Sequence, residues 1–219
     1  MKEKNPLLII IPCYRNPHLV KNFLEGIENC AKEIHRSQIT DLNTSGGVFL
    51  INDSPDDISL GEELGKAKTI LTKRNINCAI YTNKENSGFV KSVNIGLFQA
   101  IKNGCDALLL NSDAKLYTGC VDELRYVAYA DPMVGFVSPR SNDAGICTVP
   151  TLSNGSQPRM LDENLAYSTY LEISRWLPRW HLTPTAVGFC MYIKHNMLSE
   201  FGVLDEAYGH GYNEENDLV

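Results

Sequence analysis

The fold class is decided by residues 7–13, LLIIIPC, which form a continuous apolar run. Such a run is typical of a strand that is buried on both faces of a parallel sheet. Shorter apolar stretches follow along the chain and predict further strands at residues 48–53, 78–82, 107–113, 134–137 and 185–193.

Helical patterns separate these strands. Apolar residues at helical spacing predict a first helix from Pro17 to about Arg36, with Asn16 as its N-cap. The same reasoning predicts helices at residues 62–74, 88–104, 121–130, 165–180 and 194–201. The alternation predicts an α/β fold whose sheet is mainly parallel and doubly wound, with helices on both faces. Right-handed crossovers then place the carboxyl ends of the parallel strands at one edge of the sheet.

The composition is that of one ordinary globular domain, with 219 residues, 43% hydrophobic and 21% charged. A net charge of −6 without a basic cluster argues against nucleic-acid binding. Seven cysteines without a C-x-x-C motif indicate buried thiols in a reducing compartment. The apolar run at 7–11 is too short for a signal peptide or a transmembrane segment. We therefore expect a cytoplasmic protein, and contact with a membrane surface stays open.

Polar residues follow three of the predicted strands. They are Pro12 to Tyr14, Asn52-Asp53, and Asn111 to Asp113. Open α/β sheets bind ligands beyond the carboxyl ends of their strands, so the three groups together favour a ligand site. Each group alone is equally explained by capping of the following turn.

Several phosphate-binding and nucleophile motifs are absent from the sequence. It contains no G-x-G-x-x-G, no P-loop and no G-x-S-x-G nucleophile elbow. A phosphate-bearing ligand would therefore need a divalent cation, Mg²⁺ or Mn²⁺, and Asp113 is the candidate metal ligand.

A second acidic group stands near the C-terminus, after Gly209-His210-Gly211. It consists of Glu214, Glu215 and Asp217. One of the two glutamates could face the cleft as a general base. Acidic residues in a first helical turn also favour the helix dipole without any catalytic role, and both interpretations stay open here.

Five motifs occur in a recognisable order and spacing along the chain. They are IIPCYRN (10–16), INDSPDD (51–57), NKENSGFVKSVNIGL (83–97), LLLNSD (108–113) and residues 187–218. Together they make the chain similar to the family-2 glycosyltransferases, which are inverting enzymes of the GT-A fold. Three features are most similar to bacterial rhamnosyltransferase-like members: ENSGFV (85–90), SNDAGICTVP (141–150) and EENDL (214–218).

The resemblance implies roles for residues around the nucleotide. Pro12 and Tyr14 would flank the base, where an aromatic contact tolerates any base. Asp53 would accept the imide N–H of uracil, which favours a UDP- or dTDP-sugar donor. Gly88 would lie beside the nucleotide, where the backbone approaches closely, with Asn86 next to it.

The resemblance also implies a metal site and a catalytic base. Asn111 to Asp113 corresponds to the DXD motif, with asparagine in place of the first aspartate. Asp113 would hold the metal on the diphosphate, and Asn111 would bond the ribose. The pair Glu214-Glu215 corresponds to the family's acidic pair, so Glu215 would be the base, with Glu214 as the alternative. Asp217 would support the loop.

The implied activity is sugar transfer from a nucleotide-diphosphate donor to a hydroxyl of a glycan or lipid-linked glycan, in cell-surface polysaccharide synthesis. Residues 1–138 would form the donor half and residues 139–219 the acceptor and catalytic half, truncated at its C-terminal end. A nucleotide-sugar-binding module without turnover is the alternative. A sugar nucleotidyltransferase ranks last, because PCYRNP lacks a glycine-rich loop.

Overall fold

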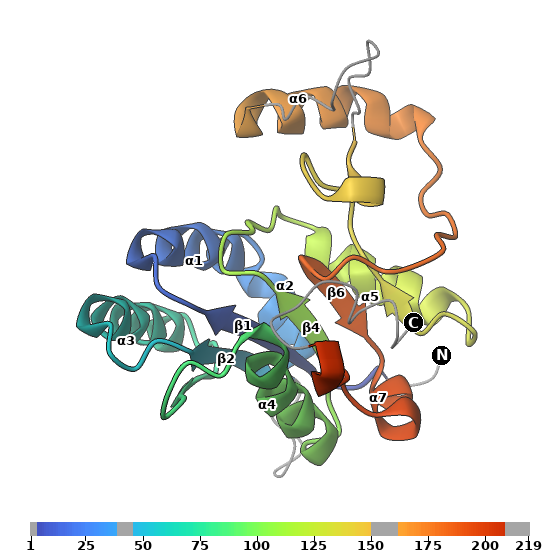
Figure 1. The fold of residues 1–219 in the computed structure, drawn as a ribbon. Coiled ribbons are helices and arrows are strands. Elements are labelled where there is room, and N and C mark those ends of the chain that lie inside the picture. The colour runs from blue at the N-terminus through green and yellow to red at the C-terminus, as the bar shows by residue number, and fades with distance from the viewer. Residues whose placement is uncertain (1–3, 39–45, 150–161, 209–219) are drawn as a thin grey trace.

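The computed structural model contains one six-stranded sheet with helices on both faces (Figure 1). It describes residues 4–38, 46–149 and 162–208. The strand order is β3-β2-β1-β4-β6-β5. The strands are β1 (Leu7–Cys13), β2 (Gly47–Asn52), β3 (Cys78–Thr82), β4 (Asp106–Leu110), β5 (Phe136–Val137) and β6 (Cys190–Ile193).

The sheet is mostly parallel, as the sequence predicts. Strands β1 to β4 pair in parallel, whereas β6 pairs antiparallel with both β4 and β5. Strand β1 lies between β2 and β4, so the strand order reverses beside β1. Such reversal points are where open α/β sheets bind ligands.

Seven α-helices are described, and they divide between the two faces of the sheet. Helices α1, α2, α3 and α5 pack on one face and α4 and α7 on the other, while α6 stands apart from the sheet (Figure 1). They are α1 (Val20–Asn29), α2 (Ala31–Ser37), α3 (Ile58–Lys73), α4 (Phe89–Lys102), α5 (Cys120–Ala130), α6 (Glu163–Ile173) and α7 (His195–Phe201). Short 3₁₀ turns lie at Pro17–Leu19, Gly145–Cys147, Ser174–Trp176 and Glu206–Tyr208.

The presence of a hydrophobic core on each face of the sheet explains the apolar run at residues 7–13. Alternate side chains of β1 point to opposite faces. Ile9 and Ile11 belong to one core cluster, and Leu8 and Ile10 belong to the other. Both faces are covered, so no position of the strand interior is left for a solvent-exposed polar residue.

The first helical region differs from the prediction. Asn16 has a φ of 51° and makes no side-chain cap, and the helix is divided at Cys30 into α1 and α2. Helix α3 begins at Ile58, four residues earlier than predicted, because the Asp57 carboxylate accepts the Leu60 N–H (2.9 Å). A side-chain cap of this kind accepts a hydrogen bond from one of the N–H groups that have no backbone partner in the first turn of a helix.

Three elements are shorter than predicted. Helix α6 ends at Ile173 and is followed by the 3₁₀ turn Ser174–Trp176. The helical run stops there, because Leu177 precedes Pro178 and adopts an extended ψ of 145°. Strand β6 spans only Cys190–Ile193, and β4 ends at Leu110. Within the described ranges, no helix has the length and apolar character needed to cross a bilayer.

Candidate functional site

The carboxyl ends of β1, β2 and β3 are joined by backbone hydrogen bonds that continue the sheet beyond its strands. The Asp53 N–H donates to the Cys13 carbonyl (2.8 Å), and the Asn83 N–H donates to the Asn52 carbonyl (2.9 Å). On the other side of β1, Ile10 is in register with Leu109 of β4. Strands lie about 4.8 Å apart, so the backbones of Asp53 and Asn111 are on the order of 10 Å from one another. The polar groups predicted at three strand ends thus share one edge.

Asp53 is buried and organises the loop between β3 and α4. Its Oδ1 accepts the Asn83 side-chain N–H (2.6 Å) and the Ser87 backbone N–H (2.7 Å), and its Oδ2 accepts the Gly88 N–H (2.9 Å). Carboxylate oxygens that accept N–H groups make strong, charge-assisted hydrogen bonds. A carboxylate can accept about four hydrogen bonds, so Oδ2 still has a lone pair for a donor on a ligand.

Gly88 occupies a position that glycine tolerates best. Its φ is 83°, in the region that residues with a Cβ rarely adopt. The Gly88 N–H also donates to the Asn86 side-chain oxygen (3.0 Å). Gly88 is the N-cap residue of α4, and no side chain caps this helix end. The first turn of α4 therefore directs N–H groups toward the carboxyl edge, where they favour an anion.

The turn after β1 carries an exposed aromatic ring. Tyr14 is 44% exposed, and the Arg15 guanidinium carbon lies 5.2 Å from the centroid of its ring. Arg15 and Asn16 have φ values of 49° and 51°, which is uncommon for residues other than glycine. The Arg15 N–H donates to the Ser54 hydroxyl (2.9 Å), so the end of β2 holds this strained turn in place.

The end of β4 presents a buried acceptor next to an exposed acid. The side-chain oxygen Oδ1 of Asn111 is buried and has no hydrogen-bond partner among the described residues. Two residues on, Asp113 is exposed, and no described residue forms a hydrogen bond or ion pair with it. Burying a polar atom without a partner is costly, so the Asn111 oxygen fits a hydroxyl supplied by a ligand.

The chain on its own offers little to hold a metal at this edge. Within residues 4–38, 46–149 and 162–208, no three His, Cys, Asp or Glu side chains come together as a metal site. Asp113 alone fits Mg²⁺ or Mn²⁺, because these ions are commonly bound by one or two carboxylates together with waters and substrate phosphates.

Comparison with known proteins identifies the architecture. No family model and no curated protein matches the chain. Among solved structures, the chain is similar to the mannosyltransferase PcManGT from Pyrobaculum calidifontis, solved with GDP-Man and Mn²⁺ (TM-score 0.61, 14% identity, 99% of this chain and 51% of that one). It is equally similar to GalNAc-T7, solved with UDP, GalNAc and Mn²⁺ (TM-score 0.61, 14% identity, 100% of this chain and 40% of that one). The fold is of the GT-A type.

The similarity shows the GT-A fold but not the reaction or the substrates, because only 14% of the residues are identical. The chain spans about half or less of the length of these two solved chains. The reaction of this protein therefore has to be inferred from its own residues.

Several predicted site residues lie outside the part of the chain that the structure describes. The predicted base Glu215, its neighbours Glu214 and Asp217, and His210 lie outside the described residues. Pro12 lies within β1, in register with Ile51 of β2.

The described cysteines are poor candidates for catalysis. Burial raises the pKa of the Cys13, Cys30 and Cys120 thiols to about 12. The thiolate is the nucleophilic form, so these thiols are inert near neutral pH. The expectation of buried thiols holds for five of the seven cysteines, whereas Cys78 and Cys120 are half-buried.

Asn83 is a site residue that the sequence reasoning missed. Its side chain is buried and donates to Asp53 and to the Ser92 hydroxyl (2.9 Å). It follows β3 directly, so the rule that identified Asp53 and Asn111, a polar residue at the carboxyl end of a strand, would have found it.

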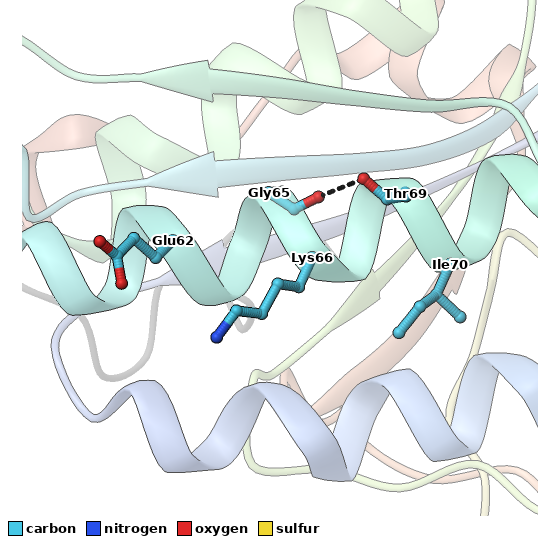
Figure 2. Close-up of a pocket in the computed structure, with 5 residues that line it drawn as sticks. All are labelled: Glu62, Gly65, Lys66, Thr69 and Ile70. Atoms are coloured by element: carbon cyan, nitrogen blue, oxygen red, sulfur yellow. Dashed lines mark hydrogen bonds between the residues drawn. The ribbon is translucent and has the colours of Figure 1, made fainter.

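A separate pocket lies along helix α3. It is lined by Glu62, Gly65, Lys66, Thr69 and Ile70, all of which come from one helix (Figure 2). The Thr69 hydroxyl donates to the Gly65 carbonyl within that helix (2.9 Å). The pocket therefore contains none of the polar strand-end residues described above.

Replacing Asp53 with asparagine should destabilise the protein. The amide offers only one oxygen to three N–H donors, and its NH₂ group faces the Gly88 N–H. A hydrogen bond to a charged group contributes about 1.5–3 kcal/mol, so we expect a loss of roughly 2–3 kcal/mol in the free energy of unfolding, measured with urea. The matched control is Asp113→Asn, an exposed change expected to stay within about 0.5 kcal/mol of wild type. Equal stability of Asp53→Asn and wild type would contradict the role given to this carboxylate.

Proposed function

We propose that the protein transfers a sugar from a nucleotide-diphosphate donor to a hydroxyl acceptor, using Mg²⁺ or Mn²⁺. The observation that carries this proposal is the end of β4, where a buried Asn111 oxygen without a described partner lies next to the exposed Asp113. This pair stands where the strand order reverses, at the edge organised by Asp53. The two similar structures support the proposal, since both were solved with Mn²⁺ and a nucleotide or a nucleotide sugar.

The donor would lie across the ends of β1, β2 and β4. Pro12 and Tyr14 would flank the base, and Oδ2 of Asp53 would accept the imide N–H of uracil or thymine. Asn86 and Gly88 would border the same base. We therefore propose a UDP- or dTDP-sugar as donor.

The diphosphate and sugar would lie toward β4. Asn111 would accept a ribose hydroxyl, and the metal would be held by Asp113. When bound, the metal would neutralise charge that grows on the leaving diphosphate. The uncapped first turn of α4 adds N–H groups that favour the same anion.

Glu215 would remove the proton from the acceptor hydroxyl, and that oxygen would attack the anomeric carbon from the side opposite the diphosphate. A single displacement inverts the anomeric configuration and needs no nucleophile on the protein. Glu214 would be the alternative base, and Asp217 would hold the loop. This assignment rests on the resemblance of residues 214–218 to the family-2 enzymes, and rhamnosyltransferase-like members in particular.

The two halves of the chain would have different roles. Residues 1–138 would bind the donor, and residues 139–219 would bind the acceptor and supply the base, in the cytoplasm. The acceptor would be a glycan or a lipid-linked glycan in cell-surface polysaccharide synthesis.

A second candidate is a nucleotide-sugar-binding module without turnover. The observation that favours it is Asn111, which removes one negative charge from the DXD-like motif and so weakens metal binding. Binding without release of the nucleoside diphosphate would identify such a module.

A thermal-shift screen of nucleotide sugars with Mn²⁺ tests the proposal. A ligand at about 100 times its Kd adds roughly 2.7 kcal/mol to the native state, which is about 5–10 °C in the Tm of a chain of this length. We expect this shift with UDP- or dTDP-sugars and a smaller one with GDP-sugars. Release of UDP or dTDP then separates the transferase from the module. If no nucleotide sugar raises the Tm, the proposed function is wrong.

A further inference from the structure

The chain that follows α6 exposes an unusual set of side chains. Residues 175–182, RWLPRWHL, are called the Trp-Arg segment here. Trp176 is 78% exposed, Trp180 45% and Leu182 85%. Two tryptophans and a leucine facing water within eight residues of chain mark an interaction surface more often than a free one.

The charge of this region is opposite to that of the rest of the protein. The chain carries a net charge of −6, yet it contains no Asp or Glu from Ile173 to Ser199. Arg175 lies over the Trp176 ring, 5.4 Å from its centroid, and Arg140 donates to the Pro178 carbonyl. Neither arginine has a carboxylate partner in the described part of the chain. Arg175 of the segment, and Arg140 in contact with it, therefore place positive charge that no described acid neutralises beside the exposed aromatic rings.

Two contacts with α5 fix the Trp-Arg segment to the sheet domain. The Arg179 guanidinium donates to both oxygens of Glu123, with 2.8 Å between Nη2 and Oε2, and its carbon lies 3.6 Å from the centroid of the Tyr126 ring. Glu123 lies in the first turn of α5. That turn follows the loop that begins at Asn111, so the segment is attached on the side of the carboxyl edge.

A second set of contacts holds α6 to the same loop. Glu163 at the start of α6 pairs with Lys115 (2.8 Å) and accepts the Tyr117 hydroxyl (2.7 Å). The Tyr117 ring stacks on Tyr167, with centroids 4.1 Å apart. Figure 1 shows α6 standing clear of the sheet, above the loop that follows β4. Helix α6, which leads into the Trp-Arg segment, is thus attached to the loop that contains Asp113.

We propose that the Trp-Arg segment docks the protein on the surface of an anionic lipid bilayer. Tryptophan side chains favour the headgroup region of a bilayer, and arginines are attracted to anionic lipids. The acidic remainder of the molecule is repelled by the same surface. Docking is therefore oriented, with the segment toward the membrane and the edge that carries Asp113 on that side. The proposal does not depend on the proposed reaction, since docking needs no donor.

Intrinsic fluorescence tests this proposal directly, because Trp176 and Trp180 are the two tryptophans of the chain. Phosphatidylcholine vesicles with phosphatidylglycerol should shift the emission to shorter wavelength, and brominated lipids should quench it. Vesicles of phosphatidylcholine alone should do neither, and raising the salt concentration should release the protein because surface charges are screened. Cosedimentation with the same vesicles gives an independent measure of binding.

Substitutions in the Trp-Arg segment, compared with a control on another face, test which residues contact the bilayer. Trp176→Ala combined with Leu182→Ala should weaken vesicle binding roughly tenfold or more, since each side chain buries apolar area in the bilayer. Arg175→Gln should weaken it about fivefold. The control is Phe98→Ala, an exposed aromatic on α4, which packs on the face of the sheet opposite α5 and should leave binding unchanged.

Three results would overturn the proposal. The first is no vesicle binding by the wild-type chain, and the second is equal binding to neutral and anionic vesicles. The third is a concentration-dependent dimer in sedimentation that the Trp176→Ala, Leu182→Ala variant abolishes, which would assign the surface to a second copy. Calorimetric titration of each variant with UDP and Mn²⁺ keeps a failure of docking distinct from a failure of the proposed function, because the variants lie outside the proposed donor site.

Discussion

Glutamine in place of Glu215 should slow sugar transfer by about 10²–10⁴-fold and leave nucleotide affinity nearly unchanged. A positioned general base contributes that much to a rate, and the amide cannot accept the proton from the acceptor hydroxyl. The residue touches the acceptor and not the nucleotide in the proposed arrangement. The measurements are the initial rate of transfer, with the acceptor found by screening, and the Kd of UDP with Mn²⁺.

The neighbouring Glu214→Gln variant is the matched control for this prediction. It removes the same charge one residue earlier in the chain. A loss of less than about tenfold is expected, because a charge beside the base acts only through the local field. A large loss in Glu214→Gln with normal transfer by Glu215→Gln would move the base to Glu214. Normal transfer by both variants would contradict the single-displacement scheme.

Replacement of Asp113 by asparagine is the second change with a large expected effect. It should lower transfer by about a hundredfold or more and remove most of the dependence on Mn²⁺. A Lewis acid contributes several kcal/mol of charge stabilisation in the transition state, and roughly 3 kcal/mol corresponds to that factor. The rate is measured over a range of Mn²⁺ concentrations. Because Asp113 is exposed and unpaired within the described residues, the protein should stay folded.

The matched control for Asp113 is Glu62→Gln in the pocket on α3. It removes an acidic charge from a pocket that is lined by α3 alone and contains none of the polar strand-end residues (Figure 2). We expect its rate and its dependence on Mn²⁺ to equal those of wild type. If both variants respond alike, the effect is one of net charge, and the metal site is not at Asp113.

Two strands could be predicted to the residue, one buried almost throughout and the other a partly exposed edge strand. Residues 7–13 and 78–82 form strands with the predicted bounds. Strand β1 is covered on both faces, so its apolar pattern is unbroken. The place of β6 beside β4, and its antiparallel direction, could not be predicted, because strand order depends on contacts between residues that are distant in the sequence.

Helix ends were less predictable than helix positions. The start of α3 depends on one hydrogen bond, from the Leu60 N–H to Asp57, and the 3₁₀ turn that follows α6 ends at the residue before Pro178. Both are local signals that apolar periodicity does not contain. The 3.6-residue period is read from buried side chains, and the first and last turns of a helix often lack them.

The candidate site could be predicted in its location more than in its contacts. The positions of Asp53 and Asn111 at one edge follow from the rule that parallel strands end together, whereas the place of Gly88 was implied by the resemblance. The three N–H donors on Asp53 were not predictable, since they come from the loop after β3. The role of Glu215 stays a prediction, because the residue lies outside the described part of the chain.

The central claim is that a divalent cation joins a nucleoside diphosphate to the carboxyl edge of this sheet. Calorimetric titration of UDP into the wild-type chain, with and without Mn²⁺, measures that linkage most directly. The account predicts that Mn²⁺ strengthens UDP binding markedly and that Asp113→Asn removes the difference. Equal affinity in the presence and absence of Mn²⁺, or no binding of UDP at all, would contradict it.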